Sequence, residues 1–531
     1  MSRAWVFLPA MALSLGALAS PLHTAQAPLF SQRELRPAPP YSSQGLEWPW
    51  KPGTARRSAA VRADLGQPGP KLTRYHFGQN TSWWSRWRWS LDEDRLAKMR
   101  QAGLTFWRFP GGSSADFYFW NGDYGKYAKA YNGDDSARVK GEEYLDFDHF
   151  MELCARSGSE PILTLNYGLA RYGSLKEAVD LATAWLRYAK AKGYAVHYVE
   201  VGNENYGNWE GGSEVPGRGR LSGEQYGKDF GAFAEALKAV DPAVKVGAVV
   251  VGDDGGDEWV GFRWWDRGVM GEVKDSADFL VVHEYFLWPF DQAKNLKPLP
   301  DDLLLGNVDR VAKLKANLDG MQDRYMHKRL PVALDEFNIV NGSPDVTIKA
   351  VNLAFTAGVL GEAASQGFAT ANIWDWTNGL DKKLGGDHGL LANDDPEVPK
   401  DTPRPSYYAY AIWQRAGGEE LLHTEIVGPL RAYATRHRDG RAGWVLINGS
   451  DEPLDLRLDL KGYHGDGKVN AWCAWAPGLA SKTIFFNDAA GPAGGGGPFP
   501  LDSLQPYVLQ AKGGNLQLTL PPASVSALVF Y

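Results

Sequence analysis

Eight short strand-like segments, separated by helical stretches, occupy the middle of this 531-residue chain. The strand-like segments are rich in β-branched and aromatic residues, and their alternation with helical periodicity is typical of parallel βα units. The predicted strands are Thr73–Gly78, Thr105–Phe109, Pro161–Asn166, His197–Gly202, Val244–Val251, Phe279–His283, Pro331–Asp335 and Thr370–Trp374. Eight such units predict an α/β fold, a (β/α)8 TIM barrel. A doubly wound open sheet is the alternative, but no glycine-rich phosphate-binding fingerprint follows the first strand.

The chain on either side of the predicted barrel has a different character. Residues 1–27 combine Arg3, an apolar run and the small-residue site Ala25-Gln26-Ala27, which predicts a cleaved export signal and a secreted or periplasmic protein. The apolar run is short for a membrane anchor. Residues 28–71, rich in Pro, Ser, Arg and Gly, are expected to form an extended segment, with the option of joining a later β domain.

The catalytic barrel is expected to cover residues 72–416. Short strands with turn signals over residues 417–531 predict a C-terminal β-sandwich. The formal net charge of −7, without a basic stripe, excludes nucleic acid as a partner. Cys154 and Cys473 are interpreted as buried free thiols, and they offer no metal motif. No cofactor is indicated, and nothing in the sequence indicates the oligomeric state.

Two glutamates stand where an active site is expected. The catalytic face of a (β/α)8 barrel lies at the carboxyl ends of its strands. Glu204 follows the fourth predicted strand and Glu336 follows the seventh. Glycoside hydrolysis needs two carboxyl groups that flank the bond to be cleaved, so we expect this pair to be catalytic. A single glutamate at a strand end is usually a solvated surface residue, but a matched pair is not explained in that way.

Further polar and aromatic residues follow the other predicted strands. They are candidates for substrate binding or for supporting the carboxylates: Asn80, Trp83, Trp84, Arg108, Asn166, Asn203, His283, Tyr285, Trp374 and Trp376. Because side chains alternate along a strand, Asp335 is expected to point away from Glu336. Asp375 is a weaker competitor for a catalytic role.

Three segments resemble clan A glycoside hydrolases, a group of retaining (β/α)8 enzymes. Val201-Gly202-Asn203-Glu204 matches the acid/base signature of that clan, and the stretch from Ala333 to Asn338 looks like its nucleophile strand. Arg108-Phe109-Pro110-Gly111-Gly112 is similar to a motif of glycoside hydrolase family 51. The resemblance implies that Glu204 is the general acid/base and Glu336 the nucleophile of a double displacement.

The resemblance also implies roles for the neighbours of the two glutamates. Asn203 would bind the sugar 2-hydroxyl and Tyr285 would donate a hydrogen bond to Glu336. Arg108 would keep Glu336 ionised, while a raised pKa would keep Glu204 protonated. His283 would orient the acid/base or a sugar hydroxyl, or would be a histidine satisfied beneath the site.

Two departures from family 51 bear on the substrate. Ser113 stands where the arabinofuranosidases of that family carry a sugar-binding Asn, and Gln79-Asn80 stands where they carry a sugar-binding Glu. Tryptophans that could stack on a series of sugars are Trp83, Trp84, Trp87, Trp89, Trp209, Trp264, Trp265 and Trp288. The first four could equally fill a hydrophobic seam.

These features favour an endo-acting β-glycanase that hydrolyses a polysaccharide or oligosaccharide. An exo-acting α-L-arabinofuranosidase is the first alternative. A non-catalytic carbohydrate-binding protein is the second, but the intact pair of glutamates disfavours it. The sequence does not indicate which polymer or linkage is cleaved.

Overall fold

The structure is a computed structural model that describes residues 39–123, 125, 127, 143–252, 264–286, 300–340, 343, 345–381 and 386–531. The predicted export signal at residues 1–27, the first part of the segment 28–71 and Trp288 lie outside the described residues. Within the described ranges, no helix combines the length and the apolar character needed to cross a membrane.

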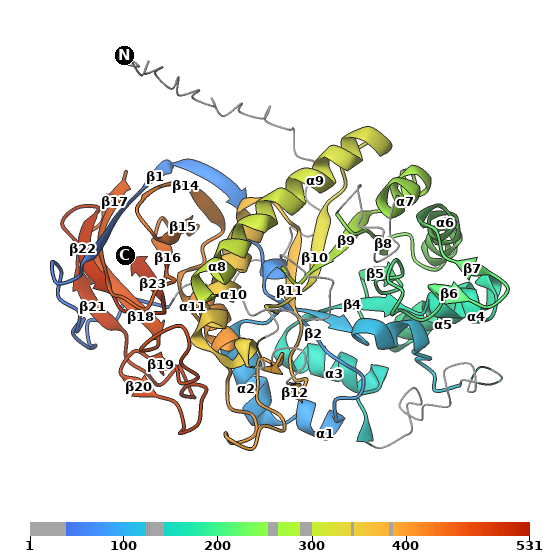
Figure 1. The fold of residues 1–531 in the computed structure, drawn as a ribbon, viewed down its shortest axis with the longest axis horizontal. Helices are drawn as coiled ribbons and strands as arrows, with labels where there is room; N and C mark the ends of the chain where they lie inside the picture. Colours follow the sequence, from blue (N-terminus) through green and yellow to red (C-terminus); the bar gives the residue numbers. More distant parts are fainter. Residues whose placement is uncertain are drawn as a thin grey trace, which may run out of the picture.

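Eight parallel strands close into a barrel, as predicted. In chain order they are β2 (Gly78–Asn80), β3 (Phe106–Phe109), β4 (Glu160–Leu165), β5 (Tyr198–Val201), β8 (Lys245–Val249), β9 (Phe279–Glu284), β10 (Val332–Phe337) and β11 (Thr370–Ile373). Strand β11 pairs with β2 and closes the barrel. Figure 1 shows the barrel beside the C-terminal sheet, which carries the last part of the chain.

The first strand is displaced from its predicted position at Thr73–Gly78. A short 3-10 helix occupies Arg74–His76, and β2 begins only at Gly78. The ring of His76 accepts a hydrogen bond from the backbone N–H of Thr73 at 3.0 Å, and this local bond competes with extended backbone. The helix places Tyr75 against Phe106 and Tyr198, where these rings pack inside the barrel.

Helices cover the outside of the barrel. The longer ones are α2 (Glu93–Ala102), α3 (Phe147–Ser157), α5 (Leu175–Lys192), α6 (Gly223–Val240), α7 (Trp265–Val273), α9 (Arg310–Tyr325), α10 (Ala350–Ser365) and α11 (Pro405–Ala416). Short helices are α1 (Trp87–Ser90), α4 (Gly168–Tyr172) and α8 (Asp301–Gly306). Helices α2, α3 and α5 begin at capping side chains of Asp92, Asp146 and Ser174 and end at left-handed glycines, which is why their limits are sharp.

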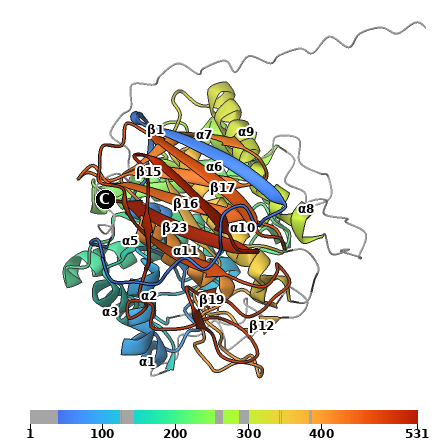
Figure 2. The ribbon, with the colours of Figure 1, turned by 90° about the vertical axis from the view of Figure 1, so that its left-hand side faces the viewer.

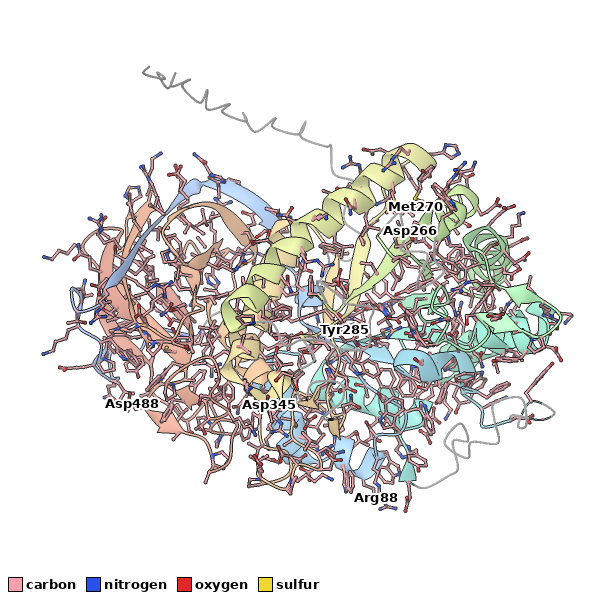
Figure 3. The ribbon with its side chains drawn as sticks, in the orientation of Figure 1. Arg88, Asp266, Met270, Tyr285, Asp345 and Asp488 are labelled. Carbon is pink, nitrogen blue, oxygen red and sulfur yellow. The ribbon has the colours of Figure 1, made fainter. Side chains whose placement is uncertain are left out.

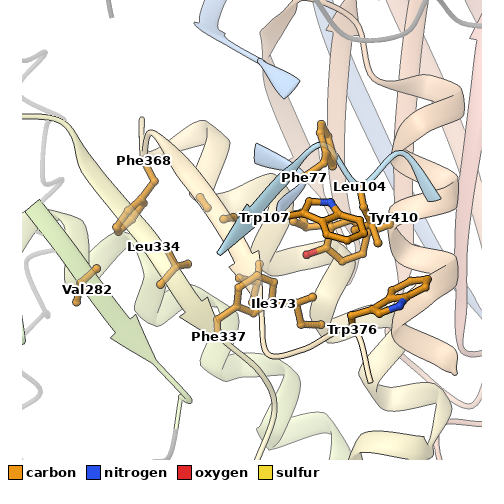
Figure 4. Packing of buried hydrophobic residues seen from close by; sticks show 14 of the residues in the cluster. Phe77, Leu104, Trp107, Val282, Leu334, Phe337, Phe368, Ile373, Trp376 and Tyr410 are labelled. Carbon is orange, nitrogen blue, oxygen red and sulfur yellow. The ribbon is translucent and has the colours of Figure 1, made fainter. Parts of the chain in front are cut away.

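Helices α10 and α11 are buried on nearly all sides because they lie between the barrel and the C-terminal sheet. Trp413 on α11 donates a hydrogen bond to the carbonyl of Ala357 on α10 at 3.1 Å. Tyr410 donates to the carbonyl of Gly78 at the start of β2. Figure 4 shows Tyr410 beside Trp107 and Phe77 in this interface. The two domains therefore share one apolar core.

The C-terminal domain is built from an 11-stranded sheet. Its strands are β1 (Arg57–Lys71), β14 (Glu420–Val427), β15 (Arg431–Arg436), β16 (Ala442–Asn448), β17 (Leu454–Lys461), β18 (Lys468–Trp475), β19 (Phe485–Phe486), β20 (Ala489–Ala490), β21 (Tyr507–Gln510), β22 (Asn515–Leu520) and β23 (Ser524–Phe530). Residues from both ends of the strand order share one apolar core, so the sheet folds over on itself. Two further pairs of very short strands are β6–β7 (Glu214–Val215, Gly219–Arg220) and β12–β13 (Leu380–Asp381, Gly386–Asp387).

Strand β1 comes from the N-terminal segment but lies inside the C-terminal sheet. It pairs antiparallel with β14 and parallel with β17. Figure 2 shows β1 in blue among the orange and red strands. Trp48, which precedes β1, packs edge-on against Tyr507 and donates its indole N–H to the carbonyl of Thr519. The cysteines Cys154 and Cys473 are both free and buried, as predicted.

Candidate active site

The two glutamates meet at the carboxyl end of the barrel. Glu204 follows β5, and Glu336 is the penultimate residue of β10. One oxygen of each carboxylate and one ring nitrogen of His283 all lie within 4.8 Å of one another. Carboxyl groups about 5 Å apart are typical of retaining glycosidases, whereas inverting enzymes hold them farther apart to admit a water molecule. The geometry therefore favours retention. Figure 3 places Tyr285, which contacts Glu336, near the centre of the barrel domain.

A tight turn after β5 brings Glu204 into the barrel mouth. Gly202 has a φ of +80°, and a Cβ there would lie 2.0 Å from the side-chain oxygen of Asn205. Glu204 itself has a φ of +41°, in the left-handed region that non-glycine residues rarely adopt. The carbonyl of Glu204 accepts a hydrogen bond from the N–H of Gly207 at 2.6 Å. The acid/base candidate is thus held in a strained conformation, as is common at functional sites.

Arg108, on β3, connects the residues beneath the site and is fully buried. Its Nη1 donates to Oε2 of Glu336 at 2.9 Å and to the side-chain oxygen of Asn80 at 3.0 Å. Its Nη2 donates to Oδ1 of Asn203 at 2.7 Å. One guanidinium therefore fixes the nucleophile candidate and the residue that precedes the acid/base candidate.

Two further acidic side chains contact Arg108. Oε1 of Glu200 lies 2.5 Å from Nε of Arg108, and Oδ2 of Asp335 lies 3.2 Å from the same atom. The expectation that Asp335 points away from Glu336 is wrong in this respect. The pairing of β10 with β9 shifts between Leu334 and Glu336, and such a bulge interrupts the alternation of side chains. Glu200 was not among the predicted residues. Strand alternation could have identified it, because Tyr198, two positions earlier on β5, also faces inward.

Each of the two candidate carboxylates accepts hydrogen bonds on both of its oxygens. Tyr285 donates its hydroxyl to Oε1 of Glu336, opposite the bond from Arg108. Nδ1 of His283 lies 2.9 Å from Oε1 of Glu204 and 3.7 Å from Oε2 of Glu336. The indole of Trp209 donates to Oε2 of Glu204 at 2.9 Å.

From the sequence, we expect a raised pKa for Glu204 and a lowered pKa for Glu336. The structure gives the opposite direction for each. Burial raises the pKa of Glu204, but the hydrogen bonds from His283 and Trp209 outweigh burial, so the pKa lies below its usual value. Burial raises the pKa of Glu336 more than His283 and Arg108 lower it. His283 lies closer to Glu204 than to Glu336, so it stabilises the charged form of Glu204 more strongly.

Asn80 and Asn166 are committed to supporting contacts. The amide nitrogen of Asn80 donates to the carbonyls of Asp335 and Ile373, and its oxygen accepts from Arg108. The amide of Asn166 donates to the carbonyl of Tyr118 and accepts the N–H of Leu169. Both asparagines therefore join strands and loops beneath the site.

The tryptophans after the first strand form no continuous exposed platform. Trp83 and Trp376 are buried in the core. Trp84 and Trp374 are half-buried, with ring centroids 6.3 Å apart, and Trp87 stacks on His149. The remaining candidates divide between the buried Trp265 and the exposed Trp89, Trp209 and Trp264. Most of the row therefore fills a seam between loops and helices.

Glu204, His283 and Glu336 are also the residues that could approach a metal ion in the described part of the chain. The oxygens of Glu336 already accept from Arg108 and Tyr285, and those of Glu204 from Trp209 and His283. A cation at this point would compete with the guanidinium of Arg108 for Glu336. The contacts fit a pair of hydrogen-bonded carboxylates better than a set of metal ligands.

Comparison with known proteins agrees with this geometry. The family model for the alpha-L-arabinofuranosidase 1 domain matches residues 98–283, which include β3 to β9. An intracellular exo-alpha-(1->5)-L-arabinofuranosidase of Streptomyces lividans is 23% identical over 271 residues, covering 47% of this chain and 38% of the relative. A probable alpha-L-arabinofuranosidase C of Aspergillus fumigatus is 26% identical over 184 residues, covering 32% of this chain and 33% of the relative. The matches thus span little more than a third of these relatives.

The fold is shared more widely than the sequence. The GH51 arabinofuranosidase from Xanthomonas axonopodis pv. citri is 17% identical, with a TM-score of 0.65 over 90% of this chain and all of the other. A family 44 xyloglucanase of Paenibacillus polymyxa is 13% identical, with a TM-score of 0.61 over 89% of this chain and 99% of the other. The family model, the curated relatives and the shared fold together support a clan A glycoside hydrolase close to glycoside hydrolase family 51.

Proposed function

We propose that the protein is a retaining glycoside hydrolase that releases terminal α-L-arabinofuranosyl units. The observation that carries the proposal is the short separation of the Glu204 and Glu336 carboxylates, with Arg108 bonded to the second. The alpha-L-arabinofuranosidase domain match and the arabinofuranosidase names of the curated relatives support the sugar.

The proposed reaction begins with Glu336 as a carboxylate and Glu204 protonated. This requires that a sugar in the site excludes water from Glu204 and so raises its pKa. Glu336 attacks the anomeric carbon as the bond from that carbon to the leaving oxygen breaks. The leaving oxygen takes the proton of Glu204, and this leaves Glu204 as a carboxylate. A glycosyl ester of Glu336 results. Esterification removes the negative charge of Glu336, and Glu204 then takes a proton from water as this water attacks the same carbon. The sugar leaves with its anomeric configuration retained.

The surroundings of the pair favour this reading over the endo-acting β-glycanase expected from the sequence. That expectation rested on a row of tryptophans as sugar platforms, and Trp83 and Trp376 are instead buried in the core. Gln79 and Ser113 still differ from the sugar-binding residues of the family 51 arabinofuranosidases. Gln79 is fully buried, and its amide nitrogen donates a hydrogen bond to the hydroxyl of Thr81.

An endo-acting β-glycanase is the second candidate, and one observation favours it. Trp209 is 51% exposed and donates to Glu204, so its ring lies beside the position of the leaving group. An exposed indole there could stack on the next sugar of a polymer.

A panel of substrates separates the candidates. Aryl α-L-arabinofuranoside and arabinan should release free arabinose, with no early fall in polymer size. Rapid shortening of a β-glucan or β-xylan, with no arabinose release, would instead establish the second candidate. Saturable binding of these polymers without any hydrolysis would leave only a carbohydrate-binding protein.

A further inference from the structure

A second pair of buried carboxyl groups lies behind the turn that carries Glu204. Glu210 belongs to the loop after β5 and is only 5% exposed. Asp116 comes from the 3-10 helix Gly112–Phe117 and is fully buried. Neither group takes part in the proposed double displacement. Burying two carboxyl groups costs free energy unless they are hydrogen-bonded or paired.

The carboxyl group of Glu210 holds the side chain of Asn203. Its Oε1 accepts hydrogen bonds from Nδ2 of Asn203 at 3.0 Å and from the hydroxyl of Ser113 at 2.7 Å. Its Oε2 is buried and has no hydrogen-bond partner among the described residues. The backbone of Glu210 is fixed as well, because its N–H donates to the carbonyl of Gly207 at 3.1 Å and its carbonyl accepts from the hydroxyl of Ser213 at 2.8 Å.

The side-chain amide of Asn203 is held at both of its polar atoms. A guanidinium can only donate hydrogen bonds, so Arg108 must bind the amide oxygen of Asn203, and it does so at 2.7 Å. Glu210 accepts from the amide nitrogen and fixes it on the opposite side. An amide nitrogen carries two hydrogens, and the bond to Glu210 uses one of them. The second hydrogen stays available next to the catalytic carboxylates.

We propose that Glu210 is a positioning residue that acts through Asn203, setting the orientation in which this amide meets the hydroxyl of the sugar beside the anomeric carbon. This inference rests on the proposed glycosidase function and assigns a task to a residue outside the catalytic pair. Ser113 contributes to the same positioning, because its hydroxyl donates to the oxygen of Glu210 that also accepts from Asn203. The serine thus supports a sugar contact through Glu210.

The surroundings of Glu210 favour its uncharged form. Burial, and then the negative charges of Glu204 and Asp116, raise the pKa of Glu210 far above its usual value. Asp116 has the same relation to Asn205, whose amide donates to it at 2.8 Å, and burial raises the pKa of Asp116 to about 8. The raised pKa thus opposes a third negative charge beside Glu204 and Glu336.

Two replacements of Glu210 separate hydrogen bonding from mere space filling. Glu210→Gln keeps an acceptor oxygen for Asn203 and Ser113, so kcat should fall by no more than about threefold. Glu210→Leu has similar bulk and no acceptor, so kcat should fall by about 100-fold while KM changes little. The split is expected because contacts to the 2-hydroxyl strengthen in the transition state. Wild-type activity in the Leu variant, or equal damage in both variants, would overturn the proposal.

A double-mutant cycle with Asn203→Ala tests whether the effect passes through Asn203. In the Asn203→Ala background, Glu210→Leu should cost no further activity, because the amide that it positions is gone. Losses that multiply would show that Glu210 acts by another route. Thermal unfolding of each variant identifies any loss of folded protein, and rates are then compared per folded molecule.

An infrared difference spectrum between the wild type and Glu210→Gln at neutral pH needs no substrate. A band of a protonated carboxyl group that is lost in the variant is the expected result, and a carboxylate band in its place would contradict it. If the wild type cleaves no glycoside at all, the proposed function fails, and the spectrum still decides whether Glu210 is neutral.

Discussion

At the scale of single residues, Arg108 sets the geometry of the site. It contacts side chains on or just after three other barrel strands, β2, β5 and β10: Asn80, Glu200, Asn203, Asp335 and Glu336. A buried guanidinium with this many carboxylate neighbours stays charged, and it compensates groups that would otherwise be buried without a partner. The chemistry of Glu336 and the position of Glu204 therefore depend on the same side chain.

Arg108→Lys should reduce kcat/KM by about 100-fold or more, because one ammonium group cannot replace three separate N–H directions. The free energy of unfolding should fall by about 3 kcal/mol, since Glu200 or Asp335 loses its partner. Arg62→Lys, on the exposed face of β1, is the matched control and should change neither quantity appreciably. Urea unfolding and steady-state kinetics supply the two numbers, and an active, stable Arg108→Lys would refute this role.

The residues that sequence could identify share one property: each stands at the end of a barrel strand. Glu204, Glu336, Arg108 and Tyr285 meet that condition, and they lie together in the structure. Glu210 could not be found in this way, because it lies in an irregular loop with no periodicity. The pKa directions also needed the structure, since they depend on where His283 lies between the carboxylates.

At the scale of structural elements, two loops at the barrel mouth approach each other closely. Gly112 lies just after β3 with a φ of +52°, and a Cβ there would come within 2.6 Å of the ring of Trp374. Trp374 follows β11 and lies above Gly112 at the edge of the site. The glycine lets these two loops approach each other.

Gly112→Ala should therefore displace Trp374 and lower kcat/KM by about tenfold or more, since small misplacements at an active site are costly. Gly158→Ala is the matched control: it also has a left-handed φ, of +73°, but has no atom within 4 Å of the added Cβ. The control should lose about 1 kcal/mol of stability and no activity. Equal kinetic effects in the two variants would argue against the packing explanation.

The hairpin between β15 and β16 carries a pH-dependent contribution to stability. Burial lowers the pKa of His437 to about 4, whereas an unfolded histidine titrates near 6.5. Between these values the unfolded chain binds the extra proton, so the contribution is complete above about pH 6.5 and is lost as the pH falls towards 4. The loss amounts to about 3 kcal/mol.

When the pH falls from 7 to 4, the free energy of unfolding should decrease by about 3 kcal/mol less in His437→Gln than in the wild type. The reason is that the titrating group is gone. Urea unfolding at both pH values measures the difference. His423→Gln, at an exposed position on β14, should show the same pH dependence as the wild type. An unchanged pH dependence in His437→Gln would contradict the role of burial.

The limits of most elements follow from local sequence, and the exceptions have physical causes. In β17 apolar and polar residues alternate, which is typical of a strand with one buried face. The first barrel strand was misplaced, because the contact between Thr73 and His76 favours a 3-10 turn. Strand β14 carries a weak strand signal in the sequence, since only one end of it is buried.

At the scale of the whole molecule, the N-terminal strand ties the two domains together. Strand β1 lies between β14 and β17, which are separated in the chain by β15 and β16. Val61 at its centre is buried in the core of the folded-over sheet. Pairing between segments this far apart in the chain cannot be read from sequence, because many sheet edges could accept such a strand.

Val61→Asn should destabilise the protein by about 3 kcal/mol, because it buries an amide in an apolar core. Since α10 and α11 share a core with both domains, barrel and sheet should unfold in one transition at a lower temperature. Calorimetry together with the temperature dependence of activity measures this. Arg62→Gln, the exposed neighbour, should unfold like the wild type. Separate transitions for activity and for the sheet would show that the domains unfold independently.

The central claim is that Glu336 forms a covalent bond to the sugar while Glu204 supplies and removes protons. Glu204→Ala should still be glycosylated by an aryl glycoside with a good leaving group, because that step then needs no acid. The second step should stall and be accelerated by azide. Mass spectrometry of the digested variant, with the aryl glycoside that the wild type cleaves, should find one glycosyl unit on the peptide that carries Glu336. A glycosyl unit on another residue, or a product of inverted configuration without any adduct, would contradict the account.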